Sequence, residues 1–185
     1  MPEHAVTWEE TFAAGLAFLR SAGIEGGLSN RLPGDDPGRL TNFGITQGTL
    51  AEYRREFPDD LDMPTSVRGL LPDHAKRIFR KLYWEPCRCA ELPPAVALVV
   101  FNAAVQSGPT QAARWLQDAL DVGEDGIVGP VTIAAARAAD PAQVIEDALT
   151  NQLMFEDHLN NWNANRHGWT RRLFRVCWLA ARRAA

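Results

Sequence analysis

The alternation of apolar and polar positions along the chain predicts a protein that is mainly helical. In the first predicted helix, residues 8–22, the apolar positions recur at helical spacing and are Phe12, Leu16 and Leu19. Thr7 and Glu10 form a Thr-x-x-Glu capping box at its start. The pair Gly26-Gly27 is a natural stop, because glycine accepts the left-handed conformation that ends helices. We therefore expect one amphipathic helix over residues 8–22, with Glu25 at or just past its C-terminal end.

Capping residues and prolines mark the helices that follow. Thr46 can cap a helix that runs to about Phe57, where Pro58 ends it. Asp73 can cap the next one, which Pro86 stops. These boundaries place two short helices before residue 87.

The centre of the chain carries its most apolar helix. Pro93-Pro94 opens the segment 95–106, which is apolar almost all round and therefore belongs in the middle of the molecule. Asp140 and Pro141 form an N-cap and a first-turn proline for a long helix that extends to about Trp162. The last helix is basic, which favours an anionic wall or membrane surface, although a solvated helical face is the default interpretation.

Glu25 is the first candidate catalytic residue. It lies at or just past the C-terminal end of the first predicted helix, where the helix dipole disfavours a negative charge. Desolvation by Ile24 and other apolar neighbours would add to this effect, and both would raise the pKa of the Glu25 carboxyl. A carboxylic acid that is still protonated near neutral pH can protonate the leaving oxygen of a glycosidic bond.

A loop or small β-hairpin follows, because four glycines and two prolines between residues 26 and 41 exclude a long helix. Asp35, Asp36 and Thr41 are the polar groups there that could position and activate a water molecule. Gly38 and Gly44 would let the backbone approach a sugar closely. An ordinary surface turn is the alternative, since Asp, Gly and Pro are the usual turn residues.

These motifs resemble the N-terminal signature of glycoside hydrolase family 108, the N-acetylmuramidases. The matching positions are Glu25, Gly26, Gly27, Asn30, Asp36, Gly38, Thr41, Asn42, Gly44, Ile45 and Thr46. The segment Phe101-Asn102-Ala103-Ala104-Val105 corresponds to the family's Phe-Asp-x-Ala-Val, with Asn102 where an acid is usual. The resemblance implies a mainly α, lysozyme-like helical fold with a small β-hairpin or loop lobe near residues 26–45.

The resemblance also implies roles for individual residues. Glu25 resembles the catalytic acid, and Asp36 with Thr41 resembles the pair that positions the attacking water. The stretch before Asp36 is about two residues longer than in the family pattern, so Asp35 remains a rival for the second carboxylate. The expected substrate-binding residues are Asn30, Asn42, Phe43, Gly44, Thr46, Asn102 and Gln106. The implied reaction is hydrolysis of the β-1,4 bond between N-acetylmuramic acid and N-acetylglucosamine, with inversion favoured over a covalent intermediate.

A second block resembles the peptidoglycan-binding repeat that accompanies this catalytic region. It runs from Trp115 to Leu120 and continues through Asp125-Gly126 to Thr132. We expect residues 1–107 to be catalytic and residues 108–185 to bind peptidoglycan, packed together as one compact unit. The alternative is that the Asp-Gly turn only joins two helices. Trp162 and Trp169, near the family-like Gly-Trp-x-x-Arg ending, could stack on sugars, although tryptophan is more often a core residue.

Composition and charge limit the binding partners and the cellular compartment that we expect. The formal net charge of −4 gives no support for nucleic-acid binding. No apolar run approaches the length needed to span a bilayer, so we expect no stable membrane insertion. The N-terminus does not resemble a signal peptide. We therefore expect synthesis in the cytoplasm, export through a holin or a secretion apparatus, and action on peptidoglycan strands in the periplasm or cell wall.

The sequence gives little support for other classes of enzyme. The four histidines lack the spacing of a zinc site, and we expect neither a metal nor a cofactor. Cys87, Cys89 and Cys177 are expected to be reduced, buried thiols. The remaining rivals are a lytic transglycosylase and a non-catalytic peptidoglycan-binding module of a phage tail or secretion machine. A phage endolysin, a secreted effector and the lysis enzyme of a gene-transfer particle are all compatible settings.

Overall fold

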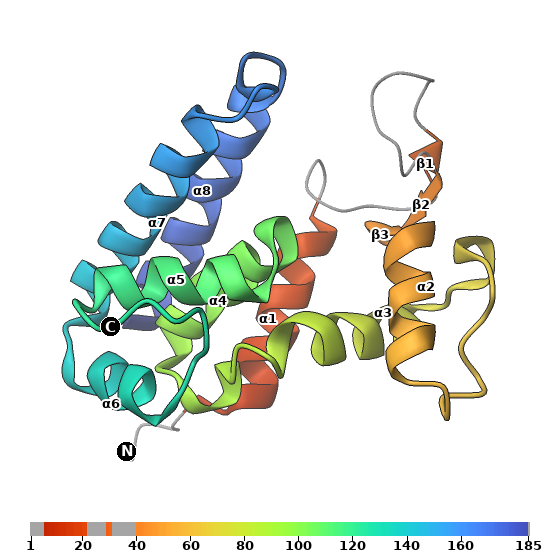
Figure 1. Cartoon of the computed structure of the whole chain (residues 1–185), viewed down its shortest axis with the longest axis horizontal. Coiled ribbons are helices and arrows are strands. Elements are labelled where there is room, and N and C mark those ends of the chain that lie inside the picture. The colour runs from red at the N-terminus through yellow and green to blue at the C-terminus, as the bar shows by residue number, and fades with distance from the viewer. Residues whose placement is uncertain (1–5, 22–28, 31–39, 185) are drawn as a thin grey trace. The chain divides into compact units, whose positions relative to one another are not determined.

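The computed structural model describes residues 6–21, 29–30 and 40–184 of the chain. It divides into two compact units (Figure 1). The larger unit comprises residues 1–15 and 83–185, and the smaller unit comprises residues 16–82. The predicted division at residue 107 stays a prediction.

The first helix, α1, spans Trp8–Arg20 and passes from the larger unit into the smaller one. Its predicted capping box is confirmed. The Thr7 N–H donates to Glu10 Oε2 at 2.9 Å, and the Glu10 N–H donates to Thr7 Oγ1 at 3.2 Å. The helix ends at Arg20 rather than at residue 22, and Ser21 forms a bend that follows it.

The smaller unit contains the expected small sheet. Three strands, β1 (Ser29–Asn30), β2 (Leu40–Asn42) and β3 (Ile45–Thr46), pair antiparallel in that order. Helix α2 (Gln47–Glu56) follows β3 directly, and the Thr46 side chain caps it by accepting from the Thr49 N–H. The predicted start at Thr46 and end near Phe57 are therefore confirmed.

The rest of the smaller unit is a loop, a 3-10 turn η1 (Val67–Gly69) and helix α3 (Pro72–Phe79), which continues as a π-helical turn, η2 (Arg80–Trp84). The prediction that Asp73 caps α3 is wrong. Proline fits the first helical position, so Leu71 becomes the cap residue and Asp73 lies in the first turn. The Leu71 N–H donates to His74 Nδ1 at 3.0 Å, which replaces a conventional side-chain cap.

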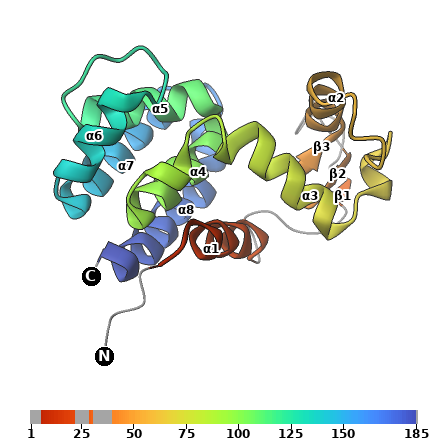
Figure 2. The same ribbon diagram turned by 90° about the horizontal axis from the view of Figure 1, so that it is seen from below.

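Helix α4 (Pro94–Ser107) is the buried centre of the larger unit, as predicted. Nearly every residue from Ala95 to Ala104 is excluded from solvent, and α4 packs against α5 (Pro109–Ala119), α7 (Pro141–Asp157) and α8 (Trp162–Ala184), as Figure 2 shows. A 3-10 turn, η3 (Cys89–Glu91), precedes it. None of the helices among the described residues is long and apolar enough to cross a membrane.

Helix α6 spans Pro130–Ala138, and helix α7 begins at Pro141, as its proline predicted. The Asp140 side chain caps α7 by accepting from the Ala142 N–H. The prediction that α7 reaches Trp162 is wrong, because the helix ends at Asp157. The Leu159 N–H then turns back to the Glu156 carbonyl, and α8 begins at Trp162 and packs along α7.

An aromatic cluster fixes α1 to the larger unit. The ring centroid of Phe12 lies 5.0 Å from that of Trp84 and 5.6 Å from that of Phe101, and the last two are 5.3 Å apart. All three side chains are buried. Gly15 follows one turn after Phe12, and a Cβ there would meet the Phe101 ring at 2.8 Å. The absence of a side chain at Gly15 therefore allows the helix to approach the cluster closely.

Candidate active site

The residues with the strongest predicted chemistry fall between the described segments. Glu25, Asp35 and Asp36 lie outside the described residues, as does Gly38. What the structure describes is the frame on either side of them. Helix α1 and Ser21 precede the segment that contains Glu25, and β1 follows it. The segment that contains both aspartates connects β1 to β2.

Thr41 occupies the centre of this frame. It pairs with Ser29 of β1 on one side and with Thr46 of β3 on the other. Directly paired residues of antiparallel strands share one face of a sheet, so Thr41 and Thr46 lie on the same face. Thr41 is partly exposed, and among the described residues its hydroxyl has no hydrogen-bond partner. Within the described part of the chain, nothing therefore engages this hydroxyl.

Asn42 has a different environment on the opposite face of the same strand. Its side-chain Nδ2 donates to the Val67 carbonyl at 3.0 Å and to the Leu70 carbonyl at 3.4 Å. Its strand partner Ile45 is 1% exposed. These contacts fix the loop before α3 to the sheet, and the predicted role of Asn42 in substrate binding stays a prediction.

Phe43 and Gly44 form the two-residue turn between β2 and β3. Both have positive φ, 55° and 76° respectively, which is the geometry of a tight hairpin turn of type I′. Glycine adopts this conformation freely, whereas Phe43 does so at a cost. The Arg20 guanidinium lies 5.9 Å from the centroid of the Phe43 ring, so the end of α1 contacts this turn.

Thr46 and Gln47 hold α2 and the following loop in place. Thr46 Oγ1 caps α2 and lies 3.0 Å from Thr49 Oγ1. Gln47 Nε2 donates to the Thr65 carbonyl at 2.8 Å, and Gln47 Oε1 accepts from the Val67 N–H at 3.1 Å. The hydroxyl of Thr46 is thus engaged in structure, in contrast to that of Thr41.

A polar cluster that the sequence did not indicate closes the loop between α2 and α3. The Tyr53 hydroxyl donates to Asp60 Oδ2 at 2.9 Å, and Arg77 bridges Asp60 and Asp62 at 3.2 and 2.8 Å. His74 Nε2 lies 3.1 Å from Asp62 Oδ2. The residues of this cluster come from α2, from the loop and from α3, so no local sequence motif contains them all. The cluster anchors the loop that binds Asn42 and Gln47.

Burial and Asp60 act on the Tyr53 phenol. Desolvation is the larger cause, and the hydrogen bond and charge of Asp60 add to it, which together raise the pKa of Tyr53 to about 12. The phenol therefore remains a neutral donor across the physiological range. The Asp62 carboxyl is affected in the opposite sense, because hydrogen bonds from Arg77 and His74 lower its pKa.

The two predicted site residues of α4 lie in the larger unit. Asn102 is 1% exposed, and its Oδ1 accepts from Arg172 Nε of α8 at 2.7 Å. Gln106 Nε2 donates to Glu156 Oε1 of α7 at 2.6 Å. These contacts join α4 to the last two helices, and the predicted roles of Asn102 and Gln106 in substrate binding stay predictions.

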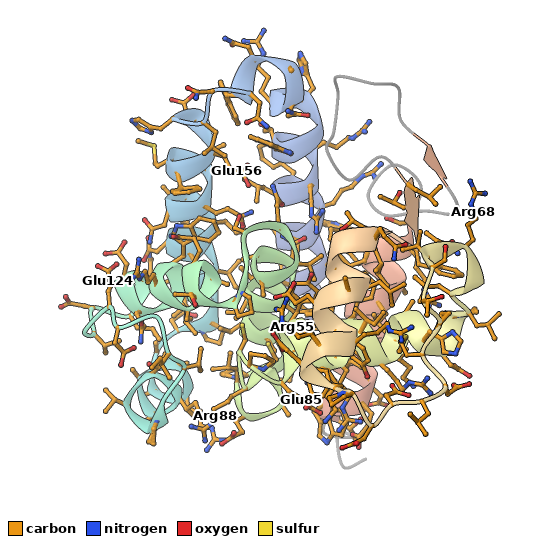
Figure 3. All side chains as sticks on the ribbon, turned by 45° about the vertical axis from the view of Figure 1, so that its right-hand side comes forward. Arg55, Arg68, Glu85, Arg88, Glu124 and Glu156 are labelled. Atoms are coloured by element: carbon orange, nitrogen blue, oxygen red, sulfur yellow. The ribbon has the colours of Figure 1, made fainter. Side chains whose placement is uncertain are left out.

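Glu156 is a buried acid that the sequence analysis missed (labelled in Figure 3). It is 1% exposed and accepts from Gln152 Nε2 at 2.8 Å as well as from Gln106. Burial raises the pKa of its carboxyl, while the Gln152 hydrogen bond and the charge of Arg172 act against this shift. An acid on an otherwise ordinary amphipathic helix gives no sequence signal of burial.

The buried side chain of Gln117 holds the Asp125-Gly126 turn of the second block in place. Gln117 is 1% exposed, and its Nε2 donates to Asp125 Oδ1 at 2.7 Å and to the Ile127 carbonyl at 3.0 Å. The Gly126 N–H donates back to Gln117 Oε1 at 2.9 Å. The turn therefore joins α5 to α6 through a buried amide, and glycan contact by it stays a prediction.

Two tryptophans at the start of α8 lie outside the core. Trp162 and Trp169 are both partly exposed, and their ring centroids are 6.2 Å apart. Trp162 lines a cleft of about 570 Å³ together with Arg166, His167, Thr170, Arg171 and Phe174. This open position suits contact with a ligand better than the core position that tryptophan usually takes.

The described residues offer no cluster of His, Cys, Asp or Glu that could hold a metal ion. Cys87, Cys89 and Cys177 are free thiols, as predicted. The first two are buried, whereas Cys177 is only partly buried. Burial, together with the neighbouring Cys87, raises the pKa of the Cys89 thiol, so this sulfur is kept protonated.

Comparison with known proteins finds a matching family model and similar solved structures, and one comparison finds nothing. Residues 20–108 match the family model of Glycosyl hydrolase 108. The structure of Brucella abortus SagA is similar to this chain with a TM-score of 0.82 and 29% sequence identity, over 95% of this chain and 97% of that one. No curated protein matches the chain significantly in sequence.

The family match covers the smaller unit from Arg20 onward and continues through α4 of the larger one. It contains every residue for which a catalytic role was predicted, and the fold is the lysozyme-like, mainly α fold that the sequence indicated. Residues 20–108 are thus similar to glycosyl hydrolase 108, and the chain is a lysozyme-like glycoside hydrolase that degrades peptidoglycan.

Proposed function

We propose that the chain is an N-acetylmuramidase that cleaves the β-1,4 bond between N-acetylmuramic acid and N-acetylglucosamine, with Glu25 as the general acid. Glu25 protonates the glycosidic oxygen while positive charge develops on the sugar ring. Asp36, or its rival Asp35, acts as the base that activates a water molecule. The Thr41 hydroxyl orients this water for attack from the opposite face, so the reaction inverts the anomeric centre.

Thr41 carries this proposal. The polar residues around it, Asn42 and Thr46, are engaged in holding the loop and capping α2. Thr41 is partly exposed, and no described residue hydrogen-bonds to its hydroxyl, at the centre of a sheet that begins where the Glu25 segment ends. The segment that contains the aspartates leads directly into Thr41 through Leu40. A water-orienting residue requires this combination of a rigid backbone and an uncommitted hydroxyl.

The first test is the release of muropeptides from purified sacculi by the wild type and by Glu25→Gln. Removal of a general acid is expected to lower the rate by about a hundredfold to ten-thousandfold. Glu9→Gln, an exposed residue of α1 outside the capping box, is the matched control and should retain full activity. Products are identified by mass and by their reducing ends. Release of N-acetylmuramic acid with a reducing end supports a muramidase, whereas anhydro-sugar products would identify a lytic transglycosylase.

Binding of sacculi without release of any product by the wild type would instead indicate a peptidoglycan-binding module and would contradict the assignment of Glu25. Asp35→Asn and Asp36→Asn, compared in the same assay, identify the second carboxylate, because only the base should produce a loss similar to that of Glu25→Gln. NMR of the newly formed anomer tests inversion directly. A β product at early times would overturn the water mechanism in favour of a covalent intermediate.

We also propose that residues 108–185 contribute to wall binding, as their resemblance to a peptidoglycan-binding repeat suggests, and that the enzyme reaches the wall by release or delivery from the cytoplasm. The open cleft beside Trp162 supports the first part of this proposal, since an indole face can stack on a sugar ring. Trp162→Ala should then lower the affinity for sacculi without changing the kinds of product formed.

A further inference from the structure

Helix α8 has an unusual charge distribution. Between Trp162 and Ala184 it contains six arginines and one histidine, and it has no acidic residue, although the whole chain has a formal net charge of −4. The exposed arginines are Arg166, Arg171, Arg175 and Arg182. Six of the chain's 19 lysine and arginine residues thus lie on one long helix that carries no acid.

Large apolar side chains share the exposed face with these charges. Phe174 is 72% exposed and Trp178 is 64% exposed. Residues three, four and seven positions apart lie on one face of a helix, and this spacing joins Arg171, Phe174, Arg175, Trp178 and Arg182. We name these five residues the aromatic–basic stripe. The Arg182 guanidinium lies 4.6 Å from the centroid of the Trp178 ring.

An apolar groove borders the stripe on one side. It has a volume of about 440 Å³ and runs between α7 and α8, which lie side by side in Figure 1. Its lining is mostly aliphatic and includes Ile145, Leu149, Leu153 and Leu173. Phe174 belongs to both features, so the groove and the stripe form one continuous surface. Glu146 is the acidic residue of the groove lining and lies on α7.

The charges and the apolar side chains of this surface together indicate which kind of partner it binds. A second copy of the chain would bring two arginine-rich helices together, and this repulsion disfavours a symmetric dimer through this face. A glycan strand could stack on Trp178, but it offers no acyl chain for Phe174 or for the aliphatic groove. A lipid surface offers both kinds of partner. Its anionic headgroups can pair with the arginines, and its acyl chains can contact the two aromatic rings and the groove.

We propose that the aromatic–basic stripe docks the enzyme on an anionic lipid bilayer surface. The helix lies parallel to the bilayer plane, Phe174 and Trp178 enter the boundary between headgroups and acyl chains, and the arginines contact anionic headgroups. The groove between α7 and α8 receives apolar lipid segments next to Phe174. The enzyme is thereby held at the membrane face that borders the wall it degrades, without crossing the bilayer.

Co-flotation of the full chain with lipid vesicles tests this proposal. Vesicles of phosphatidylcholine alone are compared with vesicles of equal amounts of phosphatidylcholine and phosphatidylglycerol. Binding is expected only to the anionic vesicles and should weaken as salt is added, because screening reduces the attraction of exposed charges. Equal binding to both kinds of vesicle, or none to either, would overturn the proposal.

Substitutions locate the binding surface. Arg171→Gln combined with Arg182→Gln should weaken partitioning by about fivefold per arginine. Phe174→Ser combined with Trp178→Ser should weaken it by about tenfold or more per aromatic residue. Each change is on the surface and should leave the circular dichroism spectrum and melting temperature unchanged.

Matched controls remove the same residue types elsewhere. Arg55→Gln with Arg68→Gln removes two exposed arginines (labelled in Figure 3), and Ile127→Ser with Val131→Ser removes two exposed apolar side chains. Neither control pair should alter vesicle binding. If the controls weaken binding as much as the stripe variants do, the attraction is non-specific and the proposed surface is wrong.

The outcome is independent of the proposed muramidase mechanism. Trp178 and Arg182 lie outside the cleft beside Trp162, so activity on lipid-free sacculi should be the same for the wild type and for the single variants Trp178→Ser and Arg182→Gln, whatever the vesicles show. Loss of that activity in Trp178→Ser would place the stripe in wall binding and would contradict a lipid-docking role. Sedimentation analysis adds a further check, since a dimer that this variant abolishes would identify a second copy as the occupant.

Discussion

At the scale of single residues, Tyr53 shows how packing sets the chemistry of a side chain. It is 2% exposed, its ring contacts that of Phe57 with centroids 4.8 Å apart, and its hydroxyl donates to Asp60. Ionisation would place a second negative charge beside this carboxylate in a desolvated position, and for this reason the pKa of Tyr53 is raised to about 12.

We expect Tyr53 to ionise late in a spectrophotometric titration at alkaline pH. The folded pKa lies above that of the unfolded chain, so this tyrosine stabilises the protein fully below about pH 10, and the contribution is lost as the pH rises to about 12. The chain has two tyrosines, Tyr53 and Tyr83, which makes the assignment simple. Tyr53→Phe should remove the late transition and Tyr83→Phe should retain it. Ionisation of Tyr53 near pH 10 in the folded protein would contradict the described contacts.

The sequence identified Thr41 as a site residue from its motif, yet motif membership alone did not separate Thr41 from Thr46 or Asn42. All three are small polar residues within six positions of each other. Their roles differ because Asn42 contacts carbonyls 25 and 28 positions away, whereas Thr46 begins a helix. Contacts of that range are set by the fold, so a local pattern cannot predict them.

At the scale of elements, the connection between α5 and α6 depends on one glycine. Gly126 has φ of 77°, and a Cβ there would lie 2.7 Å from Thr110 Cγ2 and 3.3 Å from the Thr110 carbonyl oxygen. The turn also presents the Gly126 N–H to the buried Gln117 side chain. Gly126 therefore combines a left-handed backbone conformation with a close approach to Thr110.

We predict that Gly126→Ala lowers the free energy of unfolding by about 2–3 kcal/mol, from backbone strain and from the clash with Thr110. Gly123→Ala is the matched control in the same connection, because a Cβ there meets nothing within 4 Å and the residue is outside the left-handed region. It should be neutral or slightly stabilising. Urea unfolding of the two variants measures the difference, and equal stability would show that Gly126 carries no strain.

Helix starts were easier to predict than helix ends, for a physical reason. Thr7, Thr46, Pro94 and Asp140 act within a few residues of the helix they open, so the sequence displays them directly. The end of α7 at Asp157 has no glycine or proline to mark it. It is set by the need for α8 to return along α7, which is a tertiary requirement.

At the scale of the whole molecule, both boundaries between the units fall inside helices. One lies between Gly15 and Leu16 in the middle of α1, and the other lies between Leu82 and Tyr83 in η2. A linker rich in glycine, proline or serine would have marked a boundary in the sequence, and neither site has one. The predicted division at residue 107 was based on motif order instead, and it stays a prediction.

The aromatic cluster of Phe12, Trp84 and Phe101 makes the larger unit depend on α1. We expect Phe12→Ala to destabilise the protein by about 3–5 kcal/mol, because it removes a fully packed ring and leaves a cavity between two others. Thermal unfolding followed by circular dichroism provides the measurement. Ala13→Ser, on the exposed face of the same helix, is the control and should cost little. A similar melting temperature for Phe12→Ala and the wild type would rule out the cluster as a main source of stability.

The discontinuous larger unit has a consequence for the order in which the protein can mature during synthesis. A ribosome delivers Phe12 first, but its packing partners Trp84 and Phe101 emerge only after all of residues 16–82. Val6 and Glu10 share a surface cavity with Leu179 and Arg182, which emerge long after them. The smaller unit is therefore available to fold while the chain is still growing. The larger one closes only when α8 has been released, so a nascent or prematurely terminated chain lacks the structure of the finished enzyme.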